Sequence, residues 1–149
     1  MPERETVERA REDAREGKSP STQAGEFVRE EIHHVREGKH GAASPKQAIA
    51  IGLSKARRAG VKLPSPKGRN VSTETKEKAQ RDSRRGESDS RHKVSPKRSR
   101  VTSQTLKKKG RSAASKSTLS NQARTVARKR GATARHDAAV RGSRTRKAA

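Results

Sequence analysis

Large apolar side chains are scarce in this sequence, and their scarcity limits the core that it can form. Nine Val, four Leu, three Ile and one Phe make up 17 of the 149 residues, or about 11%. A highly charged chain with less than roughly 20% of such residues cannot bury enough apolar surface to offset its loss of conformational entropy. A single globular domain of 149 residues is therefore excluded.

Charge divides the chain into two parts. Residues 1–63 hold 13 basic and 10 acidic side chains, a net charge of +3, whereas residues 64–149 hold 26 basic and 6 acidic side chains, a net charge of +20. Two prolines, Pro64 and Pro66, lie at the step and would end any helix. We predict an all-α fold with a helical module at 1–63 and a largely disordered, Lys/Arg-rich tail at 64–149.

Start and stop signals in residues 1–63 predict two to three helices. The first would run from about residue 3 to 16, the second from Pro20 to Gly38, and the third from Pro45 to about Gly60, with Ser44 as its N-cap. Apolar residues recur at helical spacing on the second and third helices. The predicted core of the module consists of Phe27, Val28, Ile32, Val35, Ile49 and Leu53. Around its Phe27–Ile32–Val35 stripe the module could bind a protein partner or a second copy of the chain.

The tail offers one further helix candidate near 118–130. One side of this helix would carry Leu119, Ala123, Val126 and Ala127, and Gly131 follows the helix. An isolated helix of this length is marginal in water, so the prediction for the rest of the tail remains disorder.

Clusters of basic residues are the strongest functional signal in the tail. A pI near 11.6 points to a polyanionic partner. Each basic side chain that contacts a phosphate releases condensed counterions, so affinity grows with the number of contacts. The predicted nucleic-acid-binding residues are Lys97, Arg98, Arg100, Lys107, Lys108, Lys109, Arg111, Arg124, Arg128, Lys129, Arg130, Arg144, Arg146 and Lys147.

Aromatic residues are almost absent, and this favours duplex DNA over RNA as the partner. Proteins that read single strands stack bases on Phe, Tyr or Trp, but Phe27 is the only such residue and is predicted to lie in the core. The sequence therefore predicts histone-like contacts to the DNA backbone with little base readout. Two alternatives remain open: an RNA-binding or ribosome-associated protein, and a stress-responsive module that binds a protein partner.

Several other classes are excluded or disfavoured. The chain has no Cys and no apolar run of 18 residues, so disulfides, thiol catalysis and a membrane span are not expected. No nucleophile–base motif or Gly-rich phosphate loop is present, and we predict no enzyme activity and no cofactor. His33, His34 and His40, near Glu30 and Glu31, are predicted to be solvated polar residues and not a metal site.

Ser-Pro-Lys occurs at Ser44, Ser65 and Ser95. The first copy is a helix start by the argument above. The copies at Ser65 and Ser95 resemble the Ser-Pro-Lys-Lys/Arg elements of linker-histone tails, and this resemblance implies a turn that presents basic side chains to DNA.

Three N-terminal segments resemble a bacterial family of small basic proteins of unknown function that are labelled only as DNA-binding proteins. These segments are residues 1–7 (MPERETV), 21–28 (STQAGEFV) and 47–60 (QAIAIGLSKARRAG). The resemblance covers roughly residues 1–68 and implies a bacterial cytoplasmic protein, located at the nucleoid if it binds DNA. It implies no mechanism and no site residues.

Overall fold

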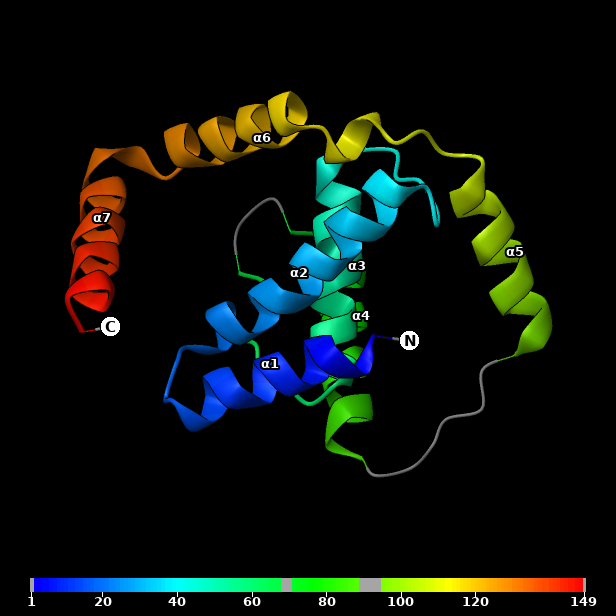
Figure 1. Ribbon diagram of the computed structural model, residues 1–149, viewed down its shortest axis with the longest axis horizontal. Helices are drawn as coiled ribbons and strands as arrows, with labels where there is room; N and C mark the ends of the chain where they lie inside the picture. The colour runs from blue at the N-terminus through cyan, green and yellow to red at the C-terminus, as the bar shows by residue number, and fades with distance from the viewer. Residues whose placement is uncertain (1, 68–70, 89–94, 149) are drawn as a thin grey trace. The chain divides into compact units, whose positions relative to one another are not determined.

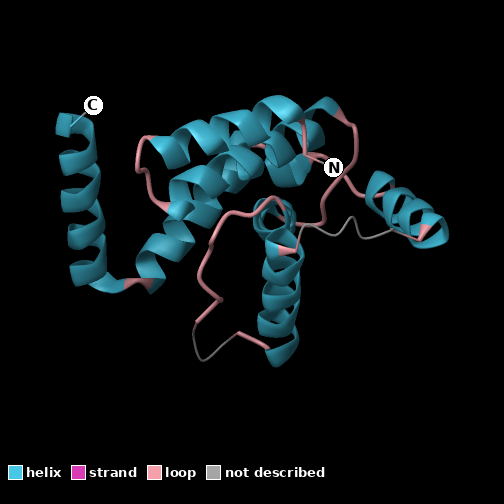
Figure 2. Cartoon of the chain, turned by 90° about the horizontal axis from the view of Figure 1, so that it is seen from below, coloured by secondary structure: helices cyan, strands magenta, loops and turns pink. Residues whose placement is uncertain are grey.

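The structure is a computed structural model that describes residues 2–67, 71–88 and 95–148. All regular structure in these ranges is helical, and no strand occurs among them (Figure 2). The elements, in chain order (Figure 1), are α1 (Arg4–Arg15), α2 (Pro20–Glu37), α3 (Pro45–Arg58), α4 (Thr73–Glu87), α5 (Pro96–Lys107), the 3-10 turn η1 (Ser112–Ala114), α6 (Lys116–Lys129) and α7 (Gly131–Ala148). Two compact units contain them, residues 1–114 and 115–149.

The three helices predicted for residues 1–63 are confirmed as α1, α2 and α3. Ser19 and Ser44 cap α2 and α3, because their side chains accept hydrogen bonds from the backbone N–H groups of Thr22 and Gln47, at 3.3 Å each. A glycine with positive φ follows each helix, as at Gly38 (φ 78°), where a side chain would be strained. Local capping chemistry therefore sets the ends of these helices.

The core of the first unit is built mainly from alanine. Eleven hydrophobic residues are buried among the described residues, and eight of them are Ala. Small side chains allow helices to approach closely, and at Gly52 of α3 an added Cβ would lie only 2.7 Å from the Cα of Val28 in α2. The count of large apolar residues underestimated this core because it left out alanine.

The predicted core residues do not all have the same environment. Phe27 and Val35 are fully buried, one in each of two apolar clusters, while Leu53 and Ile32 pack against these clusters and remain partly exposed. Val28 and Ile49 are also partly exposed. Because Phe27 and Val35 are 0% exposed, the stripe proposed as a surface for partners is already covered by this chain.

The tail is not the largely disordered segment that its composition predicts, since most of its described residues are helical. Ser72, Ser95 and Ser115 each cap the helix that follows, through a hydrogen bond from the backbone N–H three residues on. The helix α4 also packs on α3: Ala79 is buried, and a Cβ on Gly86 would lie 2.0 Å from the carbonyl oxygen of Arg57. Serine caps and buried alanines therefore provide structure that the count of large apolar residues could not predict.

The segment after α5 is attached to the loop between α2 and α3. Gly41 donates its backbone N–H to the carbonyl oxygen of Leu106 at 3.0 Å, and Ala42 donates to that of Gly110 at 3.1 Å. Ala113 and Ala114 are buried in the cluster around Val35. The first compact unit therefore extends 51 residues beyond the charge step, to residue 114.

The second unit consists of α6 and α7, and α6 occupies the segment where a helix was predicted near 118–130. Gly131, with φ 77°, is the first residue of α7 and directly follows Arg130, the C-cap of α6. Leu119, Val126 and Ala127 of α6 are only partly exposed, whereas the basic residues of α6 are exposed.

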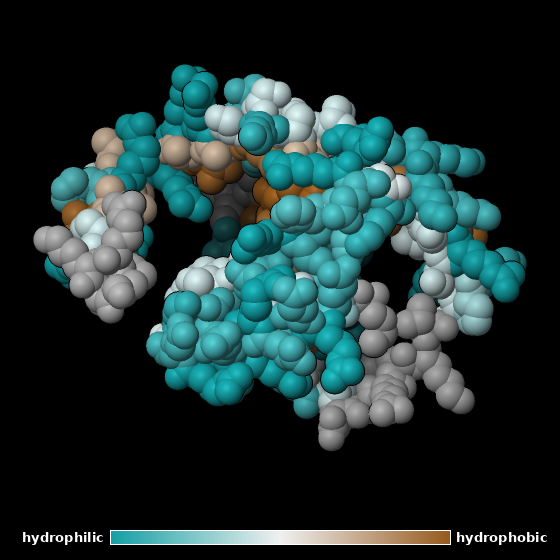
Figure 3. Space-filling model, in the orientation of Figure 1, coloured by the Kyte–Doolittle hydropathy of each residue, from teal (hydrophilic) through white to brown (hydrophobic). Residues whose placement is uncertain are grey.

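The surface is mostly polar. In the view of Figure 3, hydrophilic residues dominate and hydrophobic ones are confined to small patches. Within the described ranges, no helix combines the length and apolar character that crossing a bilayer requires.

Candidate nucleic-acid interface

The predicted binding residues of the first unit lie on α5 and in the loop after it. Lys97, Arg98 and Arg100 belong to the first half of α5, while Lys107 ends this helix. Lys108, Lys109 and Arg111 follow in the loop before η1, and all seven residues are exposed. No residue of α5 is buried. This helix therefore contributes charge to the surface and not side chains to the core.

The remaining predicted residues lie in the second unit. Arg124, Arg128 and Lys129 are exposed on α6, Arg130 is its C-cap, and Arg144 is exposed on α7. Arg124 and Arg128 are one helical turn apart and share a side of α6. Arg146 and Lys147 also belong to α7, but their side chains lie outside what the structure describes.

None of the twelve predicted residues with described side chains lies within 4.0 Å of a described carboxylate. The reason is compositional, because Asp137 is the only acidic residue after position 89. Lys97 and Arg98 also lie in the first turn of α5, where the partial positive charge of the helix disfavours cations by about 0.3–1 kcal/mol. An external anion would relieve this repulsion.

In the N-terminal helices, by contrast, several basic side chains lie close to carboxylates. Five basic side chains in residues 1–63 form ion pairs within 4.0 Å among the described residues: Arg9, Lys18, Lys39, Lys55 and Arg58. Arg9 Nε lies 2.7 Å from Glu26 Oε2, and this hydrogen bond raises the pKa of Arg9. These cations already have intramolecular partners.

The most buried of these pairs joins Lys55 of α3 to two carboxylates of α2. Lys55 Nζ lies 2.9 Å from Glu30 Oε1 and 2.8 Å from Glu31 Oε2, and the two carboxylates are 2% and 0% exposed. Burial alone would raise the pKa of Glu30, but hydrogen bonds from Lys55 and from the backbone N–H of Glu3 hold it below its usual value. Burial likewise opposes the charge of Lys55, and the two carboxylates more than compensate, so that its pKa is raised.

Two histidines extend this network. His40 Nε2 lies 3.1 Å from Glu31 Oε1, and His34 Nε2 is hydrogen-bonded to Glu3 Oε1 at 2.9 Å. The side chains of His34 and His40 are only 12% and 18% exposed, so the prediction that they are solvated is wrong; His33 is exposed as predicted.

Glu31, His34 and His40 form the group of described residues that could hold a metal ion, with ligand atoms within 4.8 Å of one another. The ammonium of Lys55 already supplies positive charge at Glu31. These residues are accounted for as a buried ion-pair network, and the sequence-based prediction that the chain has no metal site stays a prediction.

The Ser-Pro-Lys copies have two different environments. Ser95 caps α5 and accepts from the backbone N–H of Arg98 at 3.5 Å, so this copy begins a helix in the way that Ser44 does. Ser65 lies in the loop between α3 and α4. The comparison with linker-histone turns therefore fails at Ser95, where Lys97 and Arg98 are displayed from a helix.

One family model matches part of the chain, and no function is known for that family. Residues 15–67 match the model of a family of unknown function (DUF6496), which spans α2 and α3. No curated protein and no solved structure matches the chain. The predicted resemblance to DNA-binding proteins is therefore not tested by these matches.

Proposed function

We propose that this protein is a non-enzymatic, largely sequence-nonspecific DNA-binding protein that contacts phosphates with the basic residues of 95–149. The observation that carries the proposal is that no carboxylate in the described part of the chain lies within 4.0 Å of its twelve described cations, in a segment with 17 basic residues and one acidic residue. Such a density of like charge is self-repulsive unless a polyanion neutralises it.

The helical form of this segment supports a duplex as the partner. The second unit holds ten basic residues and one acidic residue in 35 positions, a net charge of +9. In a helix this is one cation per about 5 Å of length, while duplex DNA offers one phosphate per about 1.7 Å. The duplex therefore has more than enough phosphates to neutralise these cations, and no base need be read.

RNA remains the second candidate, because contacts to phosphates alone do not distinguish the two duplexes. The lack of exposed aromatic side chains disfavours single-stranded RNA in particular. A location in the cytoplasm, at the nucleoid, follows from the proposal and is tested together with it. The stress-responsive protein-interaction alternative would require a surface on the N-terminal helices other than the covered stripe.

The decisive experiment measures the affinity of the full chain for duplex DNA as a function of salt. If about ten phosphates are contacted, raising salt from about 50 to 200 mM lowers the affinity by roughly 10³–10⁵-fold. Unrelated duplex sequences should compete within a few-fold of one another, and structured RNA should compete less well. An affinity that barely changes with salt would refute the proposal.

Two charge-matched variants locate the interface. The first changes Arg124, Arg128, Lys129 and Arg130 to Gln, and the control changes Arg4, Arg11, Arg15 and Arg29, exposed residues of α1 and α2, to Gln. Both lower the net charge by four. Each lost phosphate contact lowers the salt slope by about 0.9, so the first variant should lose up to about 3.6 and the control almost nothing. Equal losses would show that only the net charge matters.

A further inference from the structure

Arg57 is the one basic side chain that the first unit buries without giving it a counter-ion among the described residues. The residue lies in the last turn of α3 and is 9% exposed. Its Nη2 donates to the carbonyl oxygen of Pro64 at 3.3 Å, and its Nε is buried with no hydrogen-bond partner. A buried guanidinium stays charged and its unsatisfied donor is costly, so the site is incomplete as it stands.

The nearest acidic residue does not complete it. Asp82 of α4 accepts a hydrogen bond from Ser54 at 2.6 Å through Oδ2, and its Oδ1 lies 3.6 Å from Arg58 Nε. Burial lowers the pKa of Arg57, and the charge of Asp82 offsets this only in part. The carboxylate of Asp82 could have paired with Arg57, but it already interacts with Ser54 and Arg58 of α3.

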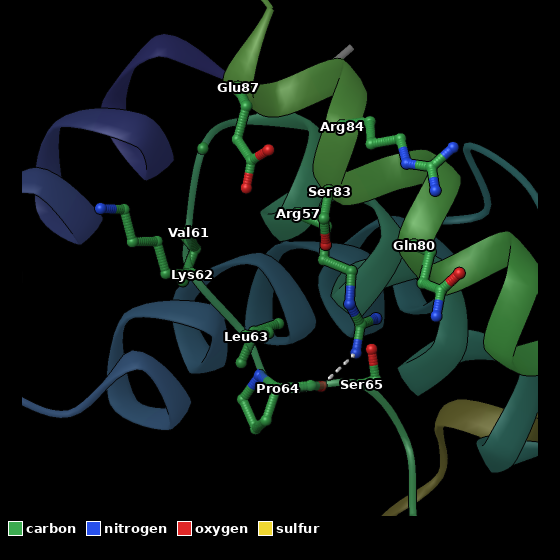
Figure 4. Close-up of a pocket in the computed structure, with 11 residues that line it drawn as sticks. Arg57, Val61, Lys62, Leu63, Pro64, Ser65, Gln80, Ser83, Arg84 and Glu87 are labelled. Carbon is green, nitrogen blue, oxygen red and sulfur yellow. Dashed lines mark hydrogen bonds between the residues drawn. The ribbon is translucent and has the colours of Figure 1, made fainter.

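Arg57 lines a cavity of about 460 Å³ between the end of α3, the segment 60–65 and α4 (Figure 4). A cavity of this size is typical of sites for small molecules. The guanidinium points towards Pro64 and Ser65, with Ser83 and Gln80 on the α4 side. Lys62 and Arg84 add two cations at the rim, against one carboxylate, Glu87.

We propose that this cavity binds a small phosphate-type oxyanion, either inorganic phosphate or a phosphomonoester, with Arg57 as its anchor. The guanidinium fork suits the geometry of phosphate oxygens. The hydroxyls of Ser65, in the segment after α3, and of Ser83, in α4, supply further donors. Val61, Leu63 and Pro64 provide an apolar wall for the organic part of an ester. This inference does not rest on the proposed DNA binding, because Arg57 belongs to none of the predicted DNA contacts.

The test observes the side-chain Nε–H resonance of Arg57 by NMR in the full chain while sodium phosphate replaces sodium chloride at constant ionic strength. Binding should shift this resonance saturably, with a Kd of about 1 mM or tighter. The resonances of exposed arginines should drift without saturating. A parallel titration with glycerol 3-phosphate distinguishes the ester from the free ion; saturation by either supports the proposal, and saturation by neither overturns it.

Variants sharpen the result. Arg57→Gln should abolish saturable binding. The matched control Arg85→Gln removes the same charge from an exposed residue of α4 that does not line the cavity, and should leave the Kd within about twofold. The Kd for these variants is read by calorimetry, with circular dichroism as the folding check. Unchanged binding by folded Arg57→Gln would overturn the proposal.

Because Arg57 is buried and its loss could unfold the chain, Glu87→Gln provides a test that leaves the core intact. Removing this exposed carboxylate should tighten phosphate binding by about two- to threefold. If instead the affinity does not change, or falls because Glu87 organises the cavity, the proposal fails. Duplex affinity should be unaltered in Arg57→Gln, so failure here would leave the proposed DNA binding intact.

Discussion

The N-terminal helices and the C-terminal segment are both rich in Lys and Arg, yet they use these residues in opposite ways. In residues 1–63 ten acidic residues accompany thirteen basic ones, and the deepest pair, Lys55 with Glu31, is enclosed between α2 and α3. In residues 95–149 a single acidic residue accompanies seventeen basic ones. The comparison teaches that the placement of Asp and Glu, more than that of Lys and Arg, decides which cations hold the fold together and which are available to a partner.

The largest effect that would test this contrast is expected at Lys55. Lys55→Met leaves Glu30 and Glu31 buried without their cation and should destabilise the first unit by about 3–5 kcal/mol. Lys129 is an exposed residue of α6, and Lys129→Met should change the free energy of unfolding by no more than about 0.5 kcal/mol. Urea denaturation followed by circular dichroism measures both. Similar losses in the two variants would abolish the distinction between structural and available cations.

A second prediction compares two helical glycines. Gly86→Ala places a Cβ 2.0 Å from the carbonyl oxygen of Arg57 and should cost about 1–3 kcal/mol, because α4 must move away from α3. Gly142→Ala in α7, where an added Cβ meets nothing within 4 Å, should instead stabilise that helix by about 0.5–1 kcal/mol. Hydrogen exchange of the α4 and α7 amides reads the two effects separately. The prediction would be contradicted if Gly142→Ala exchanged faster in α7 while Gly86→Ala showed no faster exchange in α4.

A third prediction concerns acid. Because the folded-state pKa of Glu30 is held below its usual value, its ionised form contributes stability above the unfolded pKa. This contribution is lost as pH falls from about 4.5 through the lowered pKa of the folded state. The urea concentration at the unfolding midpoint should therefore decrease as the pH is lowered from 6 to 3. Glu30→Gln should be less stable than the unmodified chain at pH 6, and its midpoint should decrease less over the same range. An identical slope in the variant would assign the acid sensitivity to other carboxylates.

The smallest effect is expected from a conservative change in the C-terminal segment. Arg128→Lys with Arg130→Lys keeps both charges and should alter duplex affinity by less than about twofold, since contact to a phosphate at an exposed site needs charge more than a bidentate fork. Competition binding at fixed salt measures the change. A loss of tenfold or more would indicate base readout by these arginines.

Sequence patterns predicted the N-terminal helices well because serine caps and glycine stops are local signals. In the tail, the helix near 118–130 was predicted, but α4 and the turn η1 were missed for a physical reason. Their alanines Ala79 and Ala114 are buried in the first unit but carry little weight in a count of large apolar residues. The candidate interface was predicted from the charge of its residues alone. The twelve of these residues whose side chains the structure describes are all exposed.

The buried ion-pair network was missed although part of its signal was present. Glu31 lies four residues after Phe27 and four before Val35, on the same side of α2 as the core, which marks it as a buried carboxylate. Its partner Lys55 comes from another helix, and no spacing within the sequence connects the two. Arg57 was missed in the same way, because it reads as an ordinary cation near a helix C-terminus.

The attachment of residues 106–114 to the loop after α2 has a consequence for the order of folding. Gly41 and Leu106 are 65 residues apart in the sequence, so bringing them together costs about 4 kcal/mol of loop-closure entropy before any contact repays it. The hairpin of α2 and α3 involves much shorter loops and should be formed in the folding transition state, with the attachment formed after it. Substitutions at Ala113 or Ala114 should therefore accelerate unfolding and leave the refolding rate nearly unchanged.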